Sequence, residues 1–345
     1  MTDADDEGPV EAAHPRATQE LFGHAEAERA LLDAYRGSRI PHAWLIGGPR
    51  GIGKATLAYR MARFVLAHPD PHDAAVKAAA SLAVDPEHRV ARRVASQGQG
   101  DLLVLERTIG ERGKLRQDIA VDDVRRSVSF FGSTAGEGGW RVAIVDSVDE
   151  LNAAGMNALL KVVEEPPPRA LLLLVSHARG TVPATIRSRC RVLNLRPLSD
   201  ADVARAAAAA LGRDAGDAEV MQAARLAEGS VGRAIGMLDG PTLDLRQRLM
   251  ELLDRLPDAD PKALHALGDA IAGTDPETLE AFIDTINGWL SARIASGLRE
   301  GRQPARLAEA WEKVNRAASE TKTFNLERKP LVFSVFGVLA EAARG

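Results

Sequence analysis

A chain of 345 residues is long enough for two or three domains, and its 45% hydrophobic residues can form buried cores. A formal net charge of −4 and an aromatic content of 4% argue against a free-standing nucleic-acid binder, since such domains are usually basic and stack bases on aromatic rings. The single cysteine, Cys190, excludes a disulfide within the chain and a cysteine-rich zinc site.

The N-terminal segment is acidic and poor in large apolar residues, so we expect residues 1–16 to form a mobile tail. It lacks the basic and apolar regions of a signal peptide. No apolar run approaches the ~20 residues that cross a bilayer. We therefore expect a cytoplasmic protein without membrane contact.

A glycine-rich turn joins the first predicted strand, residues 43–46, to a helix that runs from Lys54 to about Ala67. The turn matches a phosphate-binding loop, in which glycines let several backbone N–H groups point inward and a lysine reaches the outer phosphates. The candidate nucleotide-binding residues of this loop are Gly48, Gly51, Gly53, Lys54, Ala55 and Thr56.

The loop departs from the usual pattern at one position. Ala55 stands where a hydroxyl normally holds Mg²⁺, and Thr56 comes one residue later on a different side of the helix. The loop therefore predicts nucleotide binding more firmly than hydrolysis.

Strands alternate with helices through the next part of the chain. After an insertion at residues 72–100, which should carry one or two helices, apolar runs at 102–105, 141–145, 171–175 and 192–195 predict four more strands. Helices are expected at 121–131 and from Asn152 to Pro166. This alternation predicts a doubly wound parallel sheet, which binds ligands at the carboxyl ends of its strands.

From Ser199 onward the sequence predicts only helices. Ser199 can cap a helix that ends near Leu211, and two more follow before the turn at Gly240–Pro241. Five longer helices are expected at 244–256, 261–272, 276–298, 304–319 and 329–343. We therefore predict an α/β nucleotide-binding domain at 17–197, a helical lid at 198–240 and a helical collar at 241–345.

Acidic residues follow the strand at 141–145. Asp146 has the position of a Walker B acid that fixes Mg²⁺ beside a nucleotide, although an aspartate at a strand end can simply cap the next turn. Ser147 and Val148 stand where hydrolysing relatives often carry a water-orienting glutamate. Asp149 or Glu150 could substitute for it, or both could belong to a solvated helix start.

Three further polar residues are candidates for contact with a nucleotide. Ser176 follows a strand and could sense the terminal phosphate, and Arg233 could reach the nucleotide from the lid. Arg189 has the planar, permanently charged fork that suits phosphoryl charge across a subunit boundary. Each also has a plain reading, as a strand-end serine or a surface arginine.

Together these motifs resemble the AAA+ clamp-loader subunits of bacterial DNA polymerase III, with the delta-prime branch nearest. The resemblance is carried by the phosphate loop, the stretch from Trp140 to Asn152, the Asn-Ala-Leu-Leu-Lys…Glu-Glu-Pro-Pro run at 157–167, and Ser188-Arg189-Cys190. It covers residues 20–240 most clearly.

The resemblance implies a hetero-pentamer with gamma/tau and delta subunits that opens a sliding clamp and closes it on primed DNA. In that family Lys54 and its loop would be Walker A, Asp146 Walker B with Mg²⁺, Ser176 sensor 1 and Arg233 sensor 2, so ATP or ADP is the implied ligand. Arg189 would act in trans as an arginine finger. Many relatives carry a four-cysteine zinc module, which this chain cannot form.

Three functional readings follow. The first is a non-hydrolysing delta-prime stator that donates Arg189 to a neighbour, and the second is an ATP-hydrolysing motor subunit of the gamma/tau type. The third, outside this class, is a P-loop transferase, for which no acceptor-binding signature stands out.

Overall fold

The computed structural model describes residues 14–37, 40–108, 116, 118–132, 139–238, 242–273, 276–299, 305–323 and 326–344. The chain divides into two compact units, with the boundary between Ala234 and Ile235. Residues 1–13 of the predicted tail and the predicted boundary at Gly240–Pro241 lie outside the described residues. None of the helices in the described ranges is both long and apolar enough to span a membrane.

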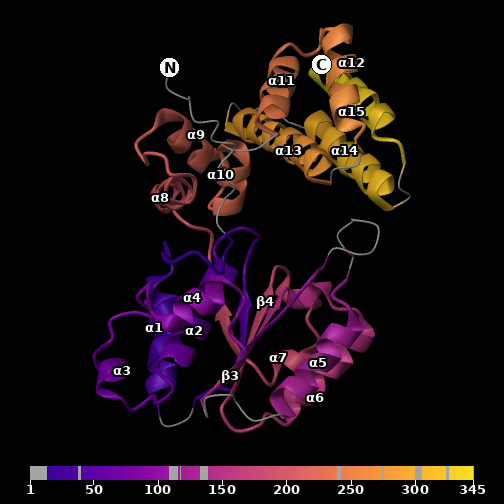
Figure 1. Ribbon diagram of the computed structural model, residues 1–345. Helices are drawn as coiled ribbons and strands as arrows, with labels where there is room; N and C mark the ends of the chain where they lie inside the picture. The colour runs from indigo at the N-terminus through magenta and orange to yellow at the C-terminus, as the bar shows by residue number, and fades with distance from the viewer. Residues whose placement is uncertain are drawn as a thin grey trace, which may run out of the picture. The chain divides into compact units, whose positions relative to one another are not determined.

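The first unit is built on a five-stranded parallel sheet with the order β2-β3-β4-β1-β5 (Figure 1). Its strands are β1 (Ala43–Gly47), β2 (Leu102–Glu106), β3 (Arg141–Asp146), β4 (Ala170–Ser176) and β5 (Arg191–Asn194). The central strands β1 and β4 are buried at every position, as expected where helices cover both faces of a parallel sheet. The predicted doubly wound sheet is confirmed.

Helices lie on both sides of this sheet (Figure 1). One side carries α1 (Ala25–Arg36), α2 (Lys54–Ala67), α3 (Ala74–Ala78) and α4 (Arg89–Ala95), and the other carries α5 (Val121–Gly132), α6 (Ala153–Glu164) and α7 (Ala184–Arg187). Alternate residues of each strand point to opposite faces. Ala43 and Leu45 of β1 accordingly share an apolar cluster with Ala143 and Val145 of β3 and with residues of α5, α6 and α7.

Three shorter helices follow the sheet: α8 (Asp200–Leu211), α9 (Ala218–Leu226) and α10 (Val231–Leu238). The predicted cap at Ser199 is confirmed, because its side chain accepts a hydrogen bond from the backbone N–H of Asp202. The first unit includes α8, α9 and the first turn of α10.

The segment before α1 is fastened to α2 by two buried arginines. Arg63 donates to the backbone carbonyls of Arg16 (2.9 Å) and Thr18 (2.6 Å), and Arg60 donates to the carbonyl of Gln19. Burial lowers the pKa of Arg63 to about 10, so the guanidinium group stays charged at neutral pH, and the two carbonyl oxygens compensate for part of the water it has lost.

The insertion at residues 72–100 contains the two short helices α3 and α4, in agreement with the prediction. Arg36, at the end of α1, donates to the carbonyls of Val76 (2.7 Å) and Ala79, and Glu28 accepts a hydrogen bond from the backbone N–H of Leu82 (3.1 Å). Apolar residues anchor the same segment: Val76, Leu82, Val90, Ala91 and Val94 are buried. Side chains of α1 and these apolar residues hold the segment in place.

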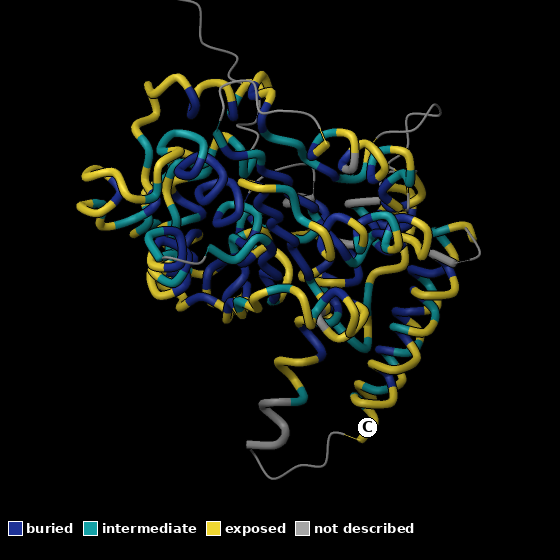
Figure 2. The backbone as a smooth tube through the Cα atoms, turned by 90° about the horizontal axis from the view of Figure 1, so that it is seen from below, coloured by how far each residue is buried: buried dark blue, intermediate teal, exposed yellow. Residues whose placement is uncertain are grey.

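The second unit contains five longer helices whose bounds agree with the predicted ones within a few residues. They are α11 (Thr242–Asp254), α12 (Pro261–Ile271), α13 (Pro276–Arg299), α14 (Ala305–Thr323) and α15 (Arg328–Ala343). Their apolar sides form one core that includes Leu249, Phe282, Ile286 and Val332. The helices alternate buried and exposed residues along their turns, as expected for amphipathic helices (Figure 2).

A polar contact between half-buried side chains joins α13 and α14. The amide groups of Asn287 and Asn315 hydrogen-bond each other in both directions, at 3.0 and 2.9 Å. This pair fixes the register of the two helices in a way that apolar contacts alone do not.

Replacing Glu28 by alanine should strongly destabilise the first unit. Glu28 accepts two hydrogen bonds from Arg60, at 2.9 and 2.7 Å, and both side chains are largely buried. The substitution leaves Arg60 as an unpaired buried charge, which costs about 3–5 kcal/mol. Urea unfolding of Glu28→Ala measures this loss.

The matched control is Glu20→Ala, which removes an exposed glutamate nearby and should change the unfolding free energy by no more than about 0.5 kcal/mol. Equal losses for the two variants would contradict the importance of the Glu28–Arg60 pair.

Candidate nucleotide-binding site

The phosphate loop connects β1 to α2 and contains three glycines with positive φ. Their φ values are +150° at Gly48, +73° at Gly51 and +94° at Gly53. A Cβ atom at Gly48 would lie 2.6 Å from the carbonyl oxygen of Leu195, which no side chain could tolerate. Glycine is therefore required by both conformation and space.

Lys54 opens α2 and is only 3% exposed. Its ammonium group donates a hydrogen bond to the carbonyl of Pro49 in the same loop. Burial lowers the pKa of Lys54 to about 8, against the opposing charges of Asp146 and Asp149. The lysine thus lies at the carboxyl edge of the sheet, between the loop and two acidic residues.

Ala55 and Thr56 follow Lys54 in the first turn of α2, and both are half-buried. Because successive residues of a helix are about 100° apart around its axis, the side chain of Thr56 leaves α2 on a different side than the side chain at position 55. The chain therefore offers no hydroxyl at the position where the loop pattern needs one.

Asp146 ends β3 opposite Val175 of β4. Burial raises the pKa of Asp146 to about 6, and the negative charges of Glu106 and Glu150 add to this rise. A bound cation would favour the charged form of this carboxyl. Within the part of the chain that the structure describes, no group of three or more metal-ligating side chains occurs, so Asp146 would need phosphate or water oxygens as the other ligands.

Asp149, one candidate for orienting a water, is already fully engaged. It accepts hydrogen bonds from the hydroxyls of Ser176 (2.9 Å) and Thr181 (3.0 Å) and from the backbone N–H of His177. Although burial opposes its charge, these hydrogen bonds lower the pKa of Asp149 overall. Asp149 therefore joins the end of β3 to the segment after β4.

Glu150, the other candidate, is also held by positive charges. Arg107 lies 2.8 Å and Arg50 3.4 Å from its carboxylate oxygens. The hydroxyl of Ser176, the predicted sensor, is committed to Asp149 and fully buried. Catalytic use of either acid, or phosphate sensing by Ser176, requires these contacts to be exchanged.

The start of α10 contacts the phosphate loop directly. The backbone N–H of Gly232 donates to the carbonyl of Gly51 (3.0 Å), and the hydroxyl of Ser230 donates to the carbonyl of Arg50 (3.0 Å). A Cβ atom at Gly51 would lie 2.3 Å from the oxygen of Ser230. The predicted lid therefore contacts the loop through one backbone N–H and one side-chain hydroxyl.

Arg233 lies in this same first turn of α10. Its guanidinium group forms an ion pair with Glu228 at 2.8 Å, and its backbone N–H donates a hydrogen bond to the hydroxyl of Ser230. It could reach a nucleotide only by leaving Glu228.

Arg189 lies at the opposite edge of the sheet from Lys54. It precedes β5, and β5 runs parallel to β1 from a start opposite Trp44. The phosphate loop follows the other end of β1. The guanidinium group of Arg189 is 3.0 Å from a carboxylate oxygen of Glu164, and its side chain is 41% exposed. The structure therefore brings together the other candidate site residues and leaves Arg189 apart.

Sequence reasoning missed two histidines beside the loop. Nε2 of His24 lies 2.6 Å from the carbonyl oxygen of Ile52, which it holds from the segment before α1. Burial and the charges of Lys54 and Arg50 lower the pKa of His177 to about 4, so His177 is neutral. The only signal for His177 was its place after a strand; nothing in the sequence linked His24 to the loop.

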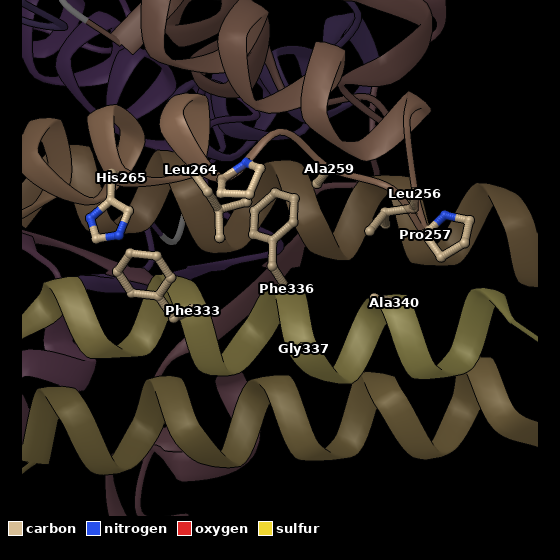
Figure 3. Close-up of a pocket in the computed structure, with 10 residues that line it drawn as sticks. Leu256, Pro257, Ala259, Leu264, His265, Phe333, Phe336, Gly337 and Ala340 are labelled. Carbon is tan, nitrogen blue, oxygen red and sulfur yellow. The ribbon is translucent and has the colours of Figure 1, made fainter.

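The second unit has a concave feature of a different kind. A cavity of about 240 Å³ lies among the loop at 256–261, α12 and α15, and apart from His265 the side chains that line it are apolar (Figure 3). The rings of His265 and Phe333 lie against each other with centroids 4.7 Å apart. It lacks the charged groups that a nucleotide needs.

Sequence comparison identifies the family. A family model described as DNA polymerase III, delta subunit, matches residues 23–199, which is just over half of the chain. The chain belongs to this family. The match contains the whole sheet, the phosphate loop and all the candidate site residues except Arg233.

The chain is similar in sequence to other subunits of DNA polymerase III. DNA polymerase III subunit delta' of Pseudomonas aeruginosa is 36% identical over 149 residues, which cover 43% of this chain and 41% of the relative. DNA polymerase III subunit tau of Bacillus subtilis is 24% identical over 300 residues, which cover 86% of this chain and 48% of the relative. The chain thus spans less than half the length of these two relatives.

Solved structures show weaker similarity. A gamma subunit-related protein of DNA polymerase III from Thermotoga maritima has a TM-score of 0.43 at 15% identity, covering 92% of this chain and 99% of its own. The RuvB Holliday junction branch migration motor of the same organism has a TM-score of 0.41 at 18% identity, covering 84% and 87%. The family assignment rests on the sequence matches.

Replacing Asp149 by alanine should destabilise the first unit by about 2–3 kcal/mol at neutral pH, because the buried hydroxyl of Ser176 and the N–H of His177 lose their acceptor. Folding lowers the pKa of Asp149 from 3.8, so its contribution is complete above that value and is lost as the pH falls below it. Urea unfolding at several pH values measures both effects.

In that experiment Asp118→Ala, which removes an exposed aspartate of the same unit, is the control. A deficit of Asp149→Ala that stays constant down to pH 3 would show that the ionised carboxylate is not the stabilising group.

Proposed function

We propose that this chain is a delta-prime-type clamp-loader subunit of DNA polymerase III, which does not hydrolyse ATP itself and supplies Arg189 to the ATP site of a neighbouring subunit. The family match and the delta' relative support this assignment. The observation that carries the trans role is the placement of Arg189 at the sheet edge away from the chain's own phosphate loop.

Sheet geometry makes action in cis unfavourable. The loop follows β1 at Gly47, whereas Arg189 precedes β5, and β1 and β5 are adjacent and parallel. The side chain would have to pass the length of the strands to reach Lys54. An exposed arginine at that edge suits a phosphate that a second chain presents, because its charge is permanent and its fork is planar.

Three features oppose hydrolysis by this chain. Ala55 supplies no Mg²⁺ ligand, and Ser147 supplies no base after Asp146. Asp149 and Glu150, the remaining acids, are held by the hydrogen bonds and ion pairs described above. The loop could still bind ATP or ADP through its N–H groups and Lys54, with Mg²⁺ beside Asp146, where the ion would neutralise phosphate charge.

The same assignment gives the rest of the chain its role. We propose that residues 17–197 form the nucleotide-binding domain, 198–240 the lid, and 241–345 the collar that joins gamma/tau and delta subunits in a hetero-pentamer. Contact with the sliding clamp and with primed DNA would come mainly through the assembled complex in the cytoplasm. The net charge of −4 fits a subunit that does not bind DNA alone.

The second candidate is an ATP-hydrolysing gamma/tau-type motor. The longer of the two matches reported above favours it, since subunit tau matches over 86% of this chain. Such a motor would need Thr56 or water to hold Mg²⁺, and Asp149 or Glu150 to leave its present partners.

The purified chain with Mg²⁺ and ATP decides between the two candidates. We expect steady-state phosphate release no higher than that of the Lys54→Ala variant, because Asp149 and Glu150, the acids that could orient a water, are held by other partners. Hydrolysis that depends on Lys54 would instead favour the motor candidate.

In the complex reconstituted with its gamma/tau and delta subunits, Arg189→Ala should remove the ATPase of one partner site. Arginine fingers contribute about 10³–10⁵ in rate at the site they serve, so the total rate should fall by that site's share. Size-exclusion chromatography should show intact assembly. Arg196→Ala, which removes an exposed arginine at the other end of β5, is the control, and an unchanged rate for Arg189→Ala would refute the trans role.

A further inference from the structure

The arginine proposed to act in trans is held by a specific partner. One Nη atom of Arg189 lies 3.0 Å from Oε1 of Glu164, and the other donates to the carbonyl of Thr185 (2.9 Å) and to the hydroxyl of Ser188 (3.3 Å). We infer that Glu164 is a positioning residue that orients the Arg189 guanidinium for the neighbouring site. This inference rests on the trans role proposed above.

Glu164 and Arg189 come from two helices that share one core. Glu164 is the last residue of α6, and Arg189 follows shortly after α7. Val162 and Val163 of α6 belong to the same buried cluster as Ile186 of α7. Shared packing therefore holds the backbone of Glu164 close to that of Arg189.

A hydrogen bond at the carboxyl edge of the sheet also connects the segments that lead into the two helices. Asp149 lies in the turn that precedes α6, and its carboxylate accepts the hydroxyl hydrogen bond of Thr181, which precedes α7. Helix α6 occupies most of the chain between Asp149 and Glu164, and α7 occupies half of the short segment between Thr181 and Arg189. The ion pair between Glu164 and Arg189 connects the two helices again at their exposed ends.

The ion pair matters most when a neighbour covers it. In the isolated chain the two side chains are 41% and 42% exposed, and water screens such pairs so well that they contribute little to folding. Covering them with a second subunit reduces screening and strengthens the attraction. An arginine without this partner would enter the neighbouring site with more rotamers, and misplacement of a charged group lowers the rate of the chemical step.

Glu164 could instead inhibit the neighbouring site. If Glu164 withheld Arg189 from the neighbour, its removal would raise the partner's ATPase. The contacts favour positioning, because the carbonyl of Thr185 in α7 and the hydroxyl of Ser188 at the end of α7 accept hydrogen bonds from the guanidinium group, while Glu164 pairs with it from a second helix.

The test uses the reconstituted complex with Glu164→Gln, which keeps the size of the side chain and removes its charge. We expect the rate at the one partner site that Arg189 serves to fall about threefold to tenfold, so the total rate falls by less than with Arg189→Ala, with the KM for ATP and the assembly unchanged. Glu164→Asp should restore most of the rate. The matched control is Glu165→Gln, since Glu165 is the next residue, carries the same charge and is exposed, while the ion pair is made by Glu164.

A double-mutant cycle separates positioning from a general structural effect. In the Arg189→Ala background, Glu164→Gln should cause no further loss, because its effect passes through the guanidinium. An equal loss in both backgrounds, an unchanged rate, or an increased rate with Glu164→Gln would each overturn the inference. An unchanged rate with Arg189→Ala alone would instead refute the proposed trans function, and the role of Glu164 with it.

Discussion

Hydrogen bonding between parallel strands fixes the direction of every loop in the first unit. Because β1 lies between β4 and β5 and all three run the same way, the phosphate loop must emerge at one edge of the sheet and the segment before β5 at the other. Lys54, Asp146 and Ser176 meet at the carboxyl edge as a result. Arg189 is excluded from that edge by the same register, which gives the chain two chemically distinct ends.

Three arginines hold neighbouring segments together on the α1–α2 side of the sheet. Arg36 holds the carbonyls of the inserted segment, Arg63 holds those of the segment before α1, and Arg60 is neutralised by Glu28. A guanidinium group offers five donors in a rigid plane, so it can satisfy several carbonyls from one buried position. The fold thus binds segments without secondary structure through charge-assisted hydrogen bonds.

Local features were readable from the sequence, and contacts between distant segments were not. The apolar runs gave the five strands, the glycines and Lys54 gave the loop, and Ser199 gave its cap, because each signal lies within a few residues. The engagement of Asp149 by Ser176 depends on a single turn after β3 and on strand pairing. The contact between Gly51 and Gly232 joins residues far apart in the chain, and no periodicity encodes it.

The contact between α10 and the phosphate loop has a mechanical consequence. Two carbonyls of the loop, at Arg50 and Gly51, accept hydrogen bonds from the hydroxyl of Ser230 and the backbone N–H of Gly232. In a subunit where only a nucleotide bridges loop and lid, each turnover would reset the angle between them. Here hydrogen bonds within the chain set that angle, so the first unit can act as a stiff spacer.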